Sequence, residues 1–339
     1  MRAAVLTGAD GRLETTEVED PVPGAGQVVA RVSACGICGS DLHIAGAFGV
    51  AGTIMGHEIA GVVEGRGDGV DRRWAPGTAV TARPFTSCGH CAACERGRAD
   101  HCAEFRLVGF GRPGGFAELV ALSADELYAL PGSVTGAEQA LVEPLAVARH
   151  GLRRTGLEPG EALVVVGAGP IGLATTAWAR ALGAGPVLVS DPLATRRALA
   201  TRLGADTVVD PVGEDLADAC RSALGAPPAL VVECSGRPGL IGQAMELCAV
   251  DGRVGVVGAC MTRDTFVPYT GLAKELDVRF ALYYDRRDFT DTLGALDDGS
   301  LVVEGLVTDV VGLDDLPEMF ARLVAGGGTG KVVVTPGKR

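Results

Sequence analysis

Two groups of residues in the first half of the chain are candidates for metal binding, and one of them is compact. Cys88, Cys91, Cys94 and Cys102 follow one another with the spacing C-x2-C-x2-C-x7-C. Four thiolates carried on short turns can close a tetrahedral site that excludes water, as in a structural zinc site. A four-cysteine iron–sulfur cluster can show similar spacings and is the main alternative. The segment of about residues 86–104 is therefore predicted to form a structural metal lobe.

The second group is dispersed along the chain. Cys38 lies in CGICGSDLH, His57 and Glu58 lie in MGHEIAG, and Glu143 lies in LVEPLAVARHG. Thiolate, imidazole and carboxylate are all zinc ligands, and a catalytic zinc site uses such ligands while leaving a position open. Each residue also has an ordinary structural explanation, such as a packed cysteine or a hydrogen-bonded core histidine. Spacing alone does not bring these four residues together.

A glycine-rich turn predicts a dinucleotide-binding site. Gly167, Gly169, Pro170, Ile171 and Gly172 belong to GAGPIG, which follows the apolar run LVVV and precedes a helix-like segment. In such a turn the first glycine allows the tight reversal, the second admits the pyrophosphate and the third lets the helix pack on the strand. A nicotinamide site elsewhere in the chain favours zinc over an iron–sulfur cluster at the four cysteines.

An acidic residue indicates which dinucleotide is bound. Asp191 ends the next predicted strand, 19 residues beyond Gly172, near the expected separation of about 20 residues. A carboxylate there can accept hydrogen bonds from a ribose 2′-hydroxyl and would repel a 2′-phosphate, so NAD is favoured over NADP. Arg196 and Arg197 follow closely. They would either receive a 2′-phosphate or lie on a solvated helix face.

The elements that must position these groups differ between the two halves of the chain. From Leu163 onward, short apolar runs such as LVVVGAG, PVLVSD, LVVECSG and RVGVVGA alternate with helix-like segments. This alternation is typical of a parallel, doubly wound sheet with both faces covered. Cys234, Val257 and Gly258 end two of these strands, and we expect them to shape the nicotinamide pocket.

The earlier part of the chain is rich in β-strand patterns and turn signals, as in QVVARVSACG and IAGVVEG. It suits a closed or partly closed barrel. We therefore predict an α/β protein with a β-rich catalytic domain over residues 1–144 and a dinucleotide-binding domain over 145–284. Residues 285–339, with VTDVV and GKVVVTP as strands, are predicted to return to the first domain.

Composition excludes several partners. The 339 residues carry a net charge of −12, which repels phosphate backbones and argues against nucleic acid. No run approaches the ~18–20 apolar residues of a membrane span, and the first residues do not resemble a signal peptide. A cytoplasmic protein with neither a membrane nor a nucleic-acid partner is expected.

Together these segments resemble the zinc-containing medium-chain dehydrogenase/reductase family. The order of motifs is the same, from the cysteine loop and GHE through the four-cysteine lobe and EPLA to the GxGxxG turn, and the match extends to GKVVV. The resemblance implies a GroES-like domain followed by a Rossmann domain, and a homotetramer or, less commonly, a homodimer. It also implies that Cys38, His57 and Glu143 bind a catalytic zinc, with Glu58 as an exchangeable ligand.

One departure from the pattern narrows the expected activity. Alcohol dehydrogenases with a Cys2His site have cysteine where this chain has Glu143. With a glutamate at this position, the chain resembles the polyol, butanediol and threonine dehydrogenase branches of the family. The resemblance thus predicts an alcohol dehydrogenase with two zinc ions per chain that transfers hydride between a secondary alcohol, such as a diol, polyol or cyclitol, and NAD, giving a ketone. Ser40 and His43 match the family's proton-relay positions.

Two alternatives remain beside this prediction. A metal-free reductase related to quinone reductases would lack the Cys38, His57 and four-cysteine sets that this chain has. A zinc-stabilised protein that binds or senses NAD without catalysis would leave the complete ligand set and Ser40 unexplained. His150 is expected to pack near the cofactor without taking part in the reaction.

Overall fold

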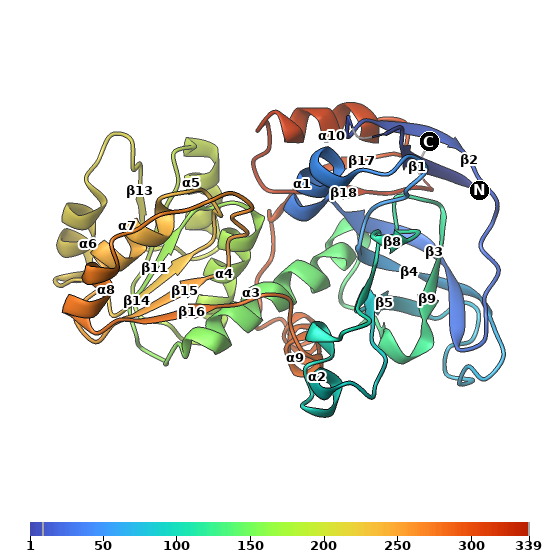
Figure 1. The fold of residues 1–339 in the computed structure, drawn as a ribbon, viewed down its shortest axis with the longest axis horizontal. Helices are drawn as coiled ribbons and strands as arrows, with labels where there is room; N and C mark the ends of the chain where they lie inside the picture. The colour runs from blue at the N-terminus through green and yellow to red at the C-terminus, as the bar shows by residue number, and fades with distance from the viewer. Residues whose placement is uncertain (9, 338–339) are drawn as a thin grey trace. The chain divides into compact units, whose positions relative to one another are not determined.

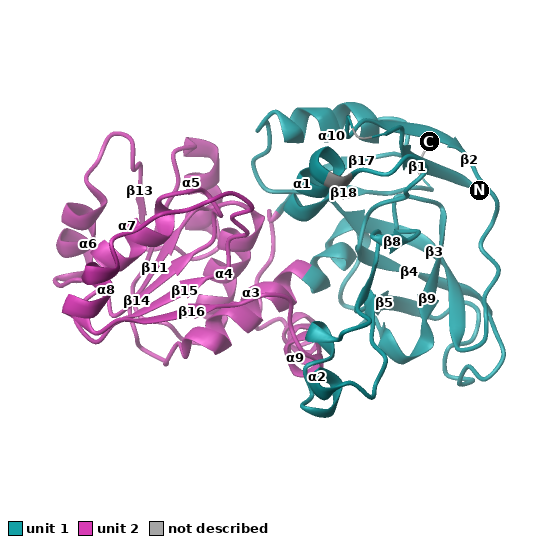
Figure 2. Ribbon diagram, in the orientation of Figure 1, with its two compact units in different colours: residues 1–143, 307–339 teal, residues 144–306 magenta. Residues whose placement is uncertain are grey.

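The computed structural model describes residues 1–8 and 10–337, which form two compact units (Figures 1 and 2). Unit 1 comprises Met1–Glu143 and the segment from Val307 onward, and unit 2 comprises Pro144–Leu306. In the described part of the chain, no helix is long and apolar enough to cross a membrane.

Unit 1 is built on a seven-stranded sheet with the order β10-β5-β4-β3-β18-β17, with β9 paired to β3. A two-stranded ribbon and a three-stranded sheet complete its β structure. The strands of unit 1 are β1 (Arg2–Leu6), β2 (Leu13–Glu17), β3 (Gln27–Gly36), β4 (Glu58–Arg66), β5 (Ala79–Ala82), β6 (Phe85–Thr86), β7 (Arg106–Val108), β8 (Gly111–Arg112), β9 (Leu119–Ser123), β10 (Leu127–Ala129), β17 (Val307–Val311) and β18 (Lys331–Val334).

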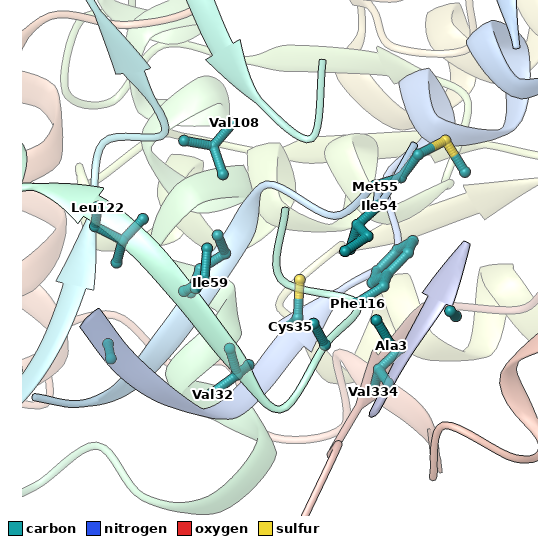
Figure 3. Close-up of a cluster of buried hydrophobic side chains, with 14 of the residues drawn as sticks. Ala3, Val32, Cys35, Ile54, Met55, Ile59, Val108, Phe116, Leu122 and Val334 are labelled. Atoms are coloured by element: carbon teal, nitrogen blue, oxygen red, sulfur yellow. The ribbon is translucent and has the colours of Figure 1, made fainter. Parts of the chain in front are cut away.

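The long strands β3 and β4 lie in the middle of this sheet. Along part of their length, buried apolar side chains alternate with exposed ones, as expected when one face of a strand packs on a core. Their inward residues join a core in which Cys35, Ile59 and Phe116 lie side by side (Figure 3). Among the described residues, the α-helices that lie wholly within this unit are α1 (Gly39–Phe48), α2 (Ala92–Glu95) and α10 (Leu316–Val324). The apolar face of α10 joins the same core through Leu316 and Phe320.

Unit 2 contains a six-stranded parallel sheet with the order β13-β12-β11-β14-β15-β16. This is the strand order of a Rossmann fold, as predicted. Its strands are β11 (Leu163–Val166), β12 (Val187–Ser190), β13 (Thr207–Val209), β14 (Leu230–Glu233), β15 (Arg253–Val256) and β16 (Asp277–Phe280). All four residues of β11, β12 and β14 are buried, which explains why these strands read as continuous apolar runs rather than alternating ones.

Helices connect the strands of unit 2 and begin at recognisable residues. Pro170 occupies the first turn of its helix, and Asp285 and Asp288 form a capping box at the start of another. The helices are α4 (Pro170–Ala181), α5 (Ala194–Arg202), α6 (Leu216–Leu224), α7 (Leu240–Leu247), α8 (Pro268–Lys274) and α9 (Arg286–Asp297). Helix α3 (Val142–Thr155) spans the boundary between the two units.

The return to unit 1 occurs later than residue 285. Helix α9 belongs to unit 2, because Asp288 on it binds both His150 and Arg153 of α3. The chain rejoins unit 1 at Val307, and β18 then pairs with β3. A capped amphipathic helix carries no local signal of the unit to which it belongs, so the sequence pattern alone did not place this boundary.

Candidate metal and dinucleotide sites

The four-cysteine lobe brings its sulfur atoms to the corners of a small tetrahedron. Cys88 follows β6, Cys91 caps the start of α2, Cys94 lies within α2, and Cys102 ends a short 3-10 helix. The sulfur–sulfur distances are 3.5 Å for 88–102, 3.6 Å for 91–94, 3.9 Å for 91–102 and 4.0 Å for 88–94. Zinc–sulfur bonds of about 2.3 Å correspond to edges of about 3.8 Å. The geometry therefore fits a zinc ion.

Backbone N–H groups surround these sulfurs. The amides of Cys88 and Glu104 donate to Cys102 Sγ, and the amide of Cys91 donates to Cys88 Sγ. The backbone N–H of Ala103, followed by that of Cys94, lowers the pKa of Cys91 to about 6. Such donors stabilise the thiolate form, which is the form that binds metal.

The second group is only partly assembled. One ligand atom each from Cys38, His57 and Glu58 lies within 4.8 Å of the other two. Antiparallel pairing of β3 with β4 sets Gly36 opposite Glu58. The residues just beyond these strand ends therefore meet, and they are Cys38 before α1 and His57 before β4.

Glu143 is not a member of this three-residue group. It is buried at the start of α3 and is the last residue of unit 1. It contributes with Glu58 to the charge environment of Lys331, so it belongs to the same region of unit 1. The structure thus brings together three of the four predicted ligands of a catalytic zinc.

Two neighbours of this group were not identified from the sequence. Asp41 is fully buried, its Oδ2 accepts a hydrogen bond from the amide of Cys38 at 2.9 Å, and its Oδ1 lies 3.3 Å from His57 Nδ1. Burial lowers the pKa of His57, but the charges and hydrogen bonds of Asp41 and Cys38 together outweigh it and raise that pKa well above its ordinary value. The spacing C-x-x-D at a helix start is the signal that could have revealed this carboxylate.

The other neighbour is Lys331, at the start of β18. Its Nζ donates to Glu58 Oε1 at 2.6 Å and to the carbonyl of Ile37 at 3.1 Å. Both side chains of the ion pair are buried. The other carboxylate oxygen, Glu58 Oε2, is buried without a hydrogen-bond partner. An unpartnered carboxylate oxygen beside a thiol is what a cation would satisfy, so this group also fits zinc.

The predicted relay residues lie on α1. Ser40 is half-buried, and its Oγ lies 3.5 Å from His57 Nε2. His43 is exposed on the same helix, one turn further along. The serine hydroxyl is therefore beside the metal-binding group, and the histidine faces solvent.

The glycine-rich turn forms a cradle at the carboxyl end of β11. Gly167 has a φ of +95°, and a Cβ on Gly172 would lie 1.8 Å from the carbonyl oxygen of Gly167. A Cβ on Gly169 would meet nothing within 4 Å. Pro170 opens α4, and Ile171 follows it. The turn and the packing thus require two of the glycines, and the open space at the third fits a pyrophosphate at a helix start.

Asp191 is buried immediately after β12 and faces this turn. Its Oδ2 accepts a hydrogen bond from the amide of Ala168 at 2.9 Å, and its Oδ1 accepts one from Leu193 at the same distance. Arg196 Nη1 lies 3.6 Å from Asp191 Oδ2. Arg197 donates to the carbonyl of Asp191 and pairs with Asp210. The predicted carboxylate is therefore at the edge of the dinucleotide site, with Arg196 beside it.

The remaining predicted residues follow β14 and β15. Cys234 is buried, and its Sγ lies 3.6 Å from Thr175 Oγ1 of α4. Val257 and Gly258 donate their amides to the carbonyl of Glu233. His150 is buried, and its Nδ1 lies 2.7 Å from Asp288 Oδ2. Cys234, Val257 and Gly258 thus lie at the carboxyl end of the sheet.

Comparisons with known proteins agree with this arrangement. Residues 24–132 match the alcohol dehydrogenase GroES-like domain, and residues 170–298 match the zinc-binding dehydrogenase domain. The chain is 35% identical to 2-dehydro-3-deoxy-L-galactonate 5-dehydrogenase of Pseudoalteromonas atlantica, with 89% of each chain covered. It is 33% identical to L-threonine 3-dehydrogenase of Thermococcus kodakarensis, with 100% of this chain and 99% of that one covered.

A solved structure is similar over nearly the whole chain. It is that of a zinc-binding dehydrogenase from Sinorhizobium meliloti bound to NADP, with a TM-score of 0.92, 30% identity and 99% of each chain covered. Both domain matches, both relatives and this structure therefore lead to one conclusion. The chain belongs to the zinc-containing medium-chain dehydrogenase/reductase family, and it is a zinc-dependent alcohol oxidoreductase.

Proposed function

We propose that this enzyme transfers hydride between a secondary alcohol of a polyhydroxylated or hydroxy-acid substrate and NAD, giving the ketone. The observation that carries the proposal is the meeting of Cys38, His57 and Glu58 within 4.8 Å in unit 1. The names of the two relatives, a galactonate 5-dehydrogenase and a threonine 3-dehydrogenase, both describe reaction at a secondary carbon. Diols, polyols and cyclitols are therefore the substrate classes to test first.

Two zinc ions per chain are part of the proposal. Cys38, His57 and Glu143 would hold the catalytic ion, with Glu58 as an exchangeable ligand, and the four cysteines of the lobe would hold the structural one. A catalytic zinc supplies Lewis-acid chemistry that makes an alcohol oxygen more acidic. Asp41 orients the imidazole of His57 through Nδ1, which leaves Nε2 for the metal.

The proton released from the alcohol needs a path to water. Ser40 would accept it, since its hydroxyl lies beside His57 Nε2 at 3.5 Å. His43, exposed one turn along α1, would pass it to solvent. In the ketone-reducing direction the same two groups would return a proton.

NAD is proposed over NADP because of Asp191. A buried carboxylate at the end of β12 suits a ribose hydroxyl and opposes a 2′-phosphate. Arg196 lies 3.6 Å from that carboxylate, where its charge is offset by Asp191. Cys234, Val257 and Gly258 would line the nicotinamide half of the site.

We propose that the protein assembles as a homotetramer, with a homodimer as the alternative. Large apolar side chains gather on one stretch of unit 2 around α8 and the edge strand β16, and this favours contact with a second copy. These exposed side chains are Met261, Val267, Tyr269, Leu272, Phe280 and Leu282. Light scattering of the purified protein would give the number of chains directly.

The test is reduction of NAD or NADP, followed by absorbance, across secondary alcohols, vicinal diols, cyclitols and primary alcohols. Turnover with NAD that is lost in Cys38→Ala, while the lobe keeps its zinc, is the expected result. Turnover that persists in Cys38→Ala would indicate a metal-free reductase. Binding of NAD without turnover of any substrate would favour a sensing or scaffolding role instead.

A further inference from the structure

A buried acid occupies the end of β14, one of the two central strands of the unit 2 sheet. Glu233 is the last residue of β14 and is 1% exposed. In the sheet it pairs with Val166 of β11 on one side and Val256 of β15 on the other. The residue after Val166 is Gly167 of the glycine-rich turn. Glu233 therefore lies between the pyrophosphate cradle and the turn after β15.

Both the side chain and the backbone of Glu233 bind neighbouring turns. Its Oε1 accepts hydrogen bonds from the amides of Ser235 at 2.6 Å and Gly236 at 2.8 Å. Its carbonyl oxygen accepts hydrogen bonds from Val257 at 2.9 Å and Gly258 at 3.0 Å. Burial raises the pKa of Glu233, whereas the two amides that it binds act in the opposite direction. One residue thus holds two turns in place.

The turns after β11, β14 and β15 pack so closely that two of their glycines have no room for a side chain. A Cβ on Gly258 would lie 2.2 Å from the amide nitrogen of Gly236 and 2.5 Å from Glu233 Oε2. A Cβ on Gly167 would lie 2.8 Å from the Cβ of Ser235. The three turns after β11, β14 and β15 therefore touch, backbone against backbone, around the Glu233 carboxylate.

The strand order determines which part of the cofactor meets these turns. From β11 the chain adds β12 and β13 on one side of the sheet, and it then crosses to add β14, β15 and β16 on the other side. The crevice at which a ligand binds in such a sheet therefore lies between the ends of β11 and β14. The pyrophosphate belongs at the glycine-rich turn, and Asp191 after β12 marks the adenosine side. The nicotinamide half must then extend over the ends of β14 and β15, where Ser235, Gly236, Val257 and Gly258 lie.

We propose that Glu233 is a positioning residue for the nicotinamide half of the cofactor, acting through the Ser235–Gly236 turn that its carboxylate holds. This inference rests on the proposed dehydrogenase function, since it assumes that a nicotinamide dinucleotide binds here. Without the acceptor, the turn samples other conformations, and the apparent affinity falls in proportion to the competent fraction. The adenosine half has its own contacts and is not affected.

The test compares NAD with ADP-ribose, which lacks the nicotinamide, by calorimetric titration of the purified enzyme without substrate. Glu233→Met is close in size but cannot accept a hydrogen bond. It is expected to weaken NAD binding about tenfold and to leave ADP-ribose binding unchanged. Glu233→Gln restores an acceptor and should recover most of the affinity.

A second variant keeps the test decisive if Glu233→Met does not fold. Glu233→Asp preserves the charge but withdraws the oxygens by about 1.5 Å, one carbon–carbon bond; it should also weaken NAD but not ADP-ribose. The matched control is Glu161→Met, which removes a carboxylate that binds Arg253 at the opposite end of the same sheet. This control should leave the NAD to ADP-ribose affinity ratio unchanged.

The outcomes separate this inference from the proposed function. If the unmodified enzyme binds neither NAD nor NADP, the proposed function is wrong. If it binds NAD and the Glu233 variants bind as tightly, or lose NAD and ADP-ribose equally, Glu233 has no specific role at the nicotinamide and the inference is overturned.

Discussion

Lys331 Nζ lies 2.6 Å from Glu58 Oε1, and the two side chains are buried together although 273 residues separate them in the sequence. Strand β3 brings them together, because it pairs on one side with β4, which begins at Glu58, and on the other side with β18, which begins at Lys331. The charges of Glu58 and neighbouring acids keep the pKa of Lys331 above its ordinary value despite the opposing effect of burial. The C-terminal segment thus supplies the counter-charge of a candidate metal ligand.

Replacing this lysine should destabilise unit 1. Lys331→Met leaves the Glu58 carboxylate buried without a counter-charge, and we expect the free energy of unfolding to fall by about 3–5 kcal/mol. Urea unfolding measures this loss. The double variant Lys331→Met with Glu58→Gln removes the stranded charge and should regain a large part of it. Simple additivity of the two substitutions would contradict the buried pairing.

Asp41 should affect metal affinity more than stability. Asp41→Asn weakens the support of His57 Nδ1, and loss of such a carboxylate typically lowers metal affinity or activity about 10–100-fold. Competition with a zinc chelator measures the affinity, and the zinc of the four-cysteine lobe should be unaffected. Asp215→Asn is the matched control, because Asp215 also caps a helix, α6, but belongs to none of the candidate metal-binding groups found among the described residues. Equal zinc affinities in the two variants would show that Asp41 only caps α1.

The four-cysteine lobe should depend on its metal. In Cys91→Ser one corner of the tetrahedron loses its thiolate, and we expect the loss of about one zinc equivalent per chain. The segment 86–104 should then become sensitive to limited proteolysis. Cys220→Ser, at a buried cysteine of α6 outside the lobe, should retain the full zinc content. A Cys91→Ser protein with unchanged zinc would refute a zinc site in the lobe.

The contact between α3 and α9 should weaken in acid. Asp288 is buried and binds His150 Nδ1 and Arg153 Nε at 2.7 Å each. Burial raises the pKa of Asp288, but the hydrogen bonds from His150 and Arg153 outweigh it and lower the pKa well below its usual range. Because the folded-state pKa is the lower one, this stabilisation is present above about pH 4 and is lost as the pH falls further.

Asp288→Asn is therefore expected to lower the free energy of unfolding at pH 7 by about 3 kcal/mol. The difference in the free energy of unfolding between this variant and the unmodified protein should shrink near about pH 3, where the carboxylate of the unfolded chain takes up a proton while that of the folded chain stays ionised. Urea unfolding at the two pH values measures both differences. Asp291→Asn, one turn along α9 and partly exposed beside Arg149, should cost less than about 1 kcal/mol. If Asp288→Asn lowered the free energy of unfolding by the same amount at both pH values, the ionised contact of Asp288 with His150 and Arg153 would not be the cause of the loss.

Local patterns predicted much of the fold. The alternating pattern of QVVARVSACG corresponds to β3, and the four-residue apolar run before the glycine-rich turn corresponds to β11. The four cysteines meet because only short turns separate them. In each case the residues that determine the structure are close together in the sequence. Backbone conformational preferences and the periodicity of apolar side chains act between such neighbouring residues.

The arrangement of distant residues was decided by the tertiary structure. The register of β3 against β4 brings Cys38 close to His57. Ion pairs between α9 and α3 hold α9 in unit 2, so the chain re-enters unit 1 only at Val307. Asp41, Lys331 and Glu233 had no local signal of comparable strength, and Glu143 remained outside the group that the sequence analysis predicted. By itself, the sequence determined which residue types and turns are available. Their combination into sites depends on strand pairing and burial across the whole fold, and these contacts are not local in the sequence.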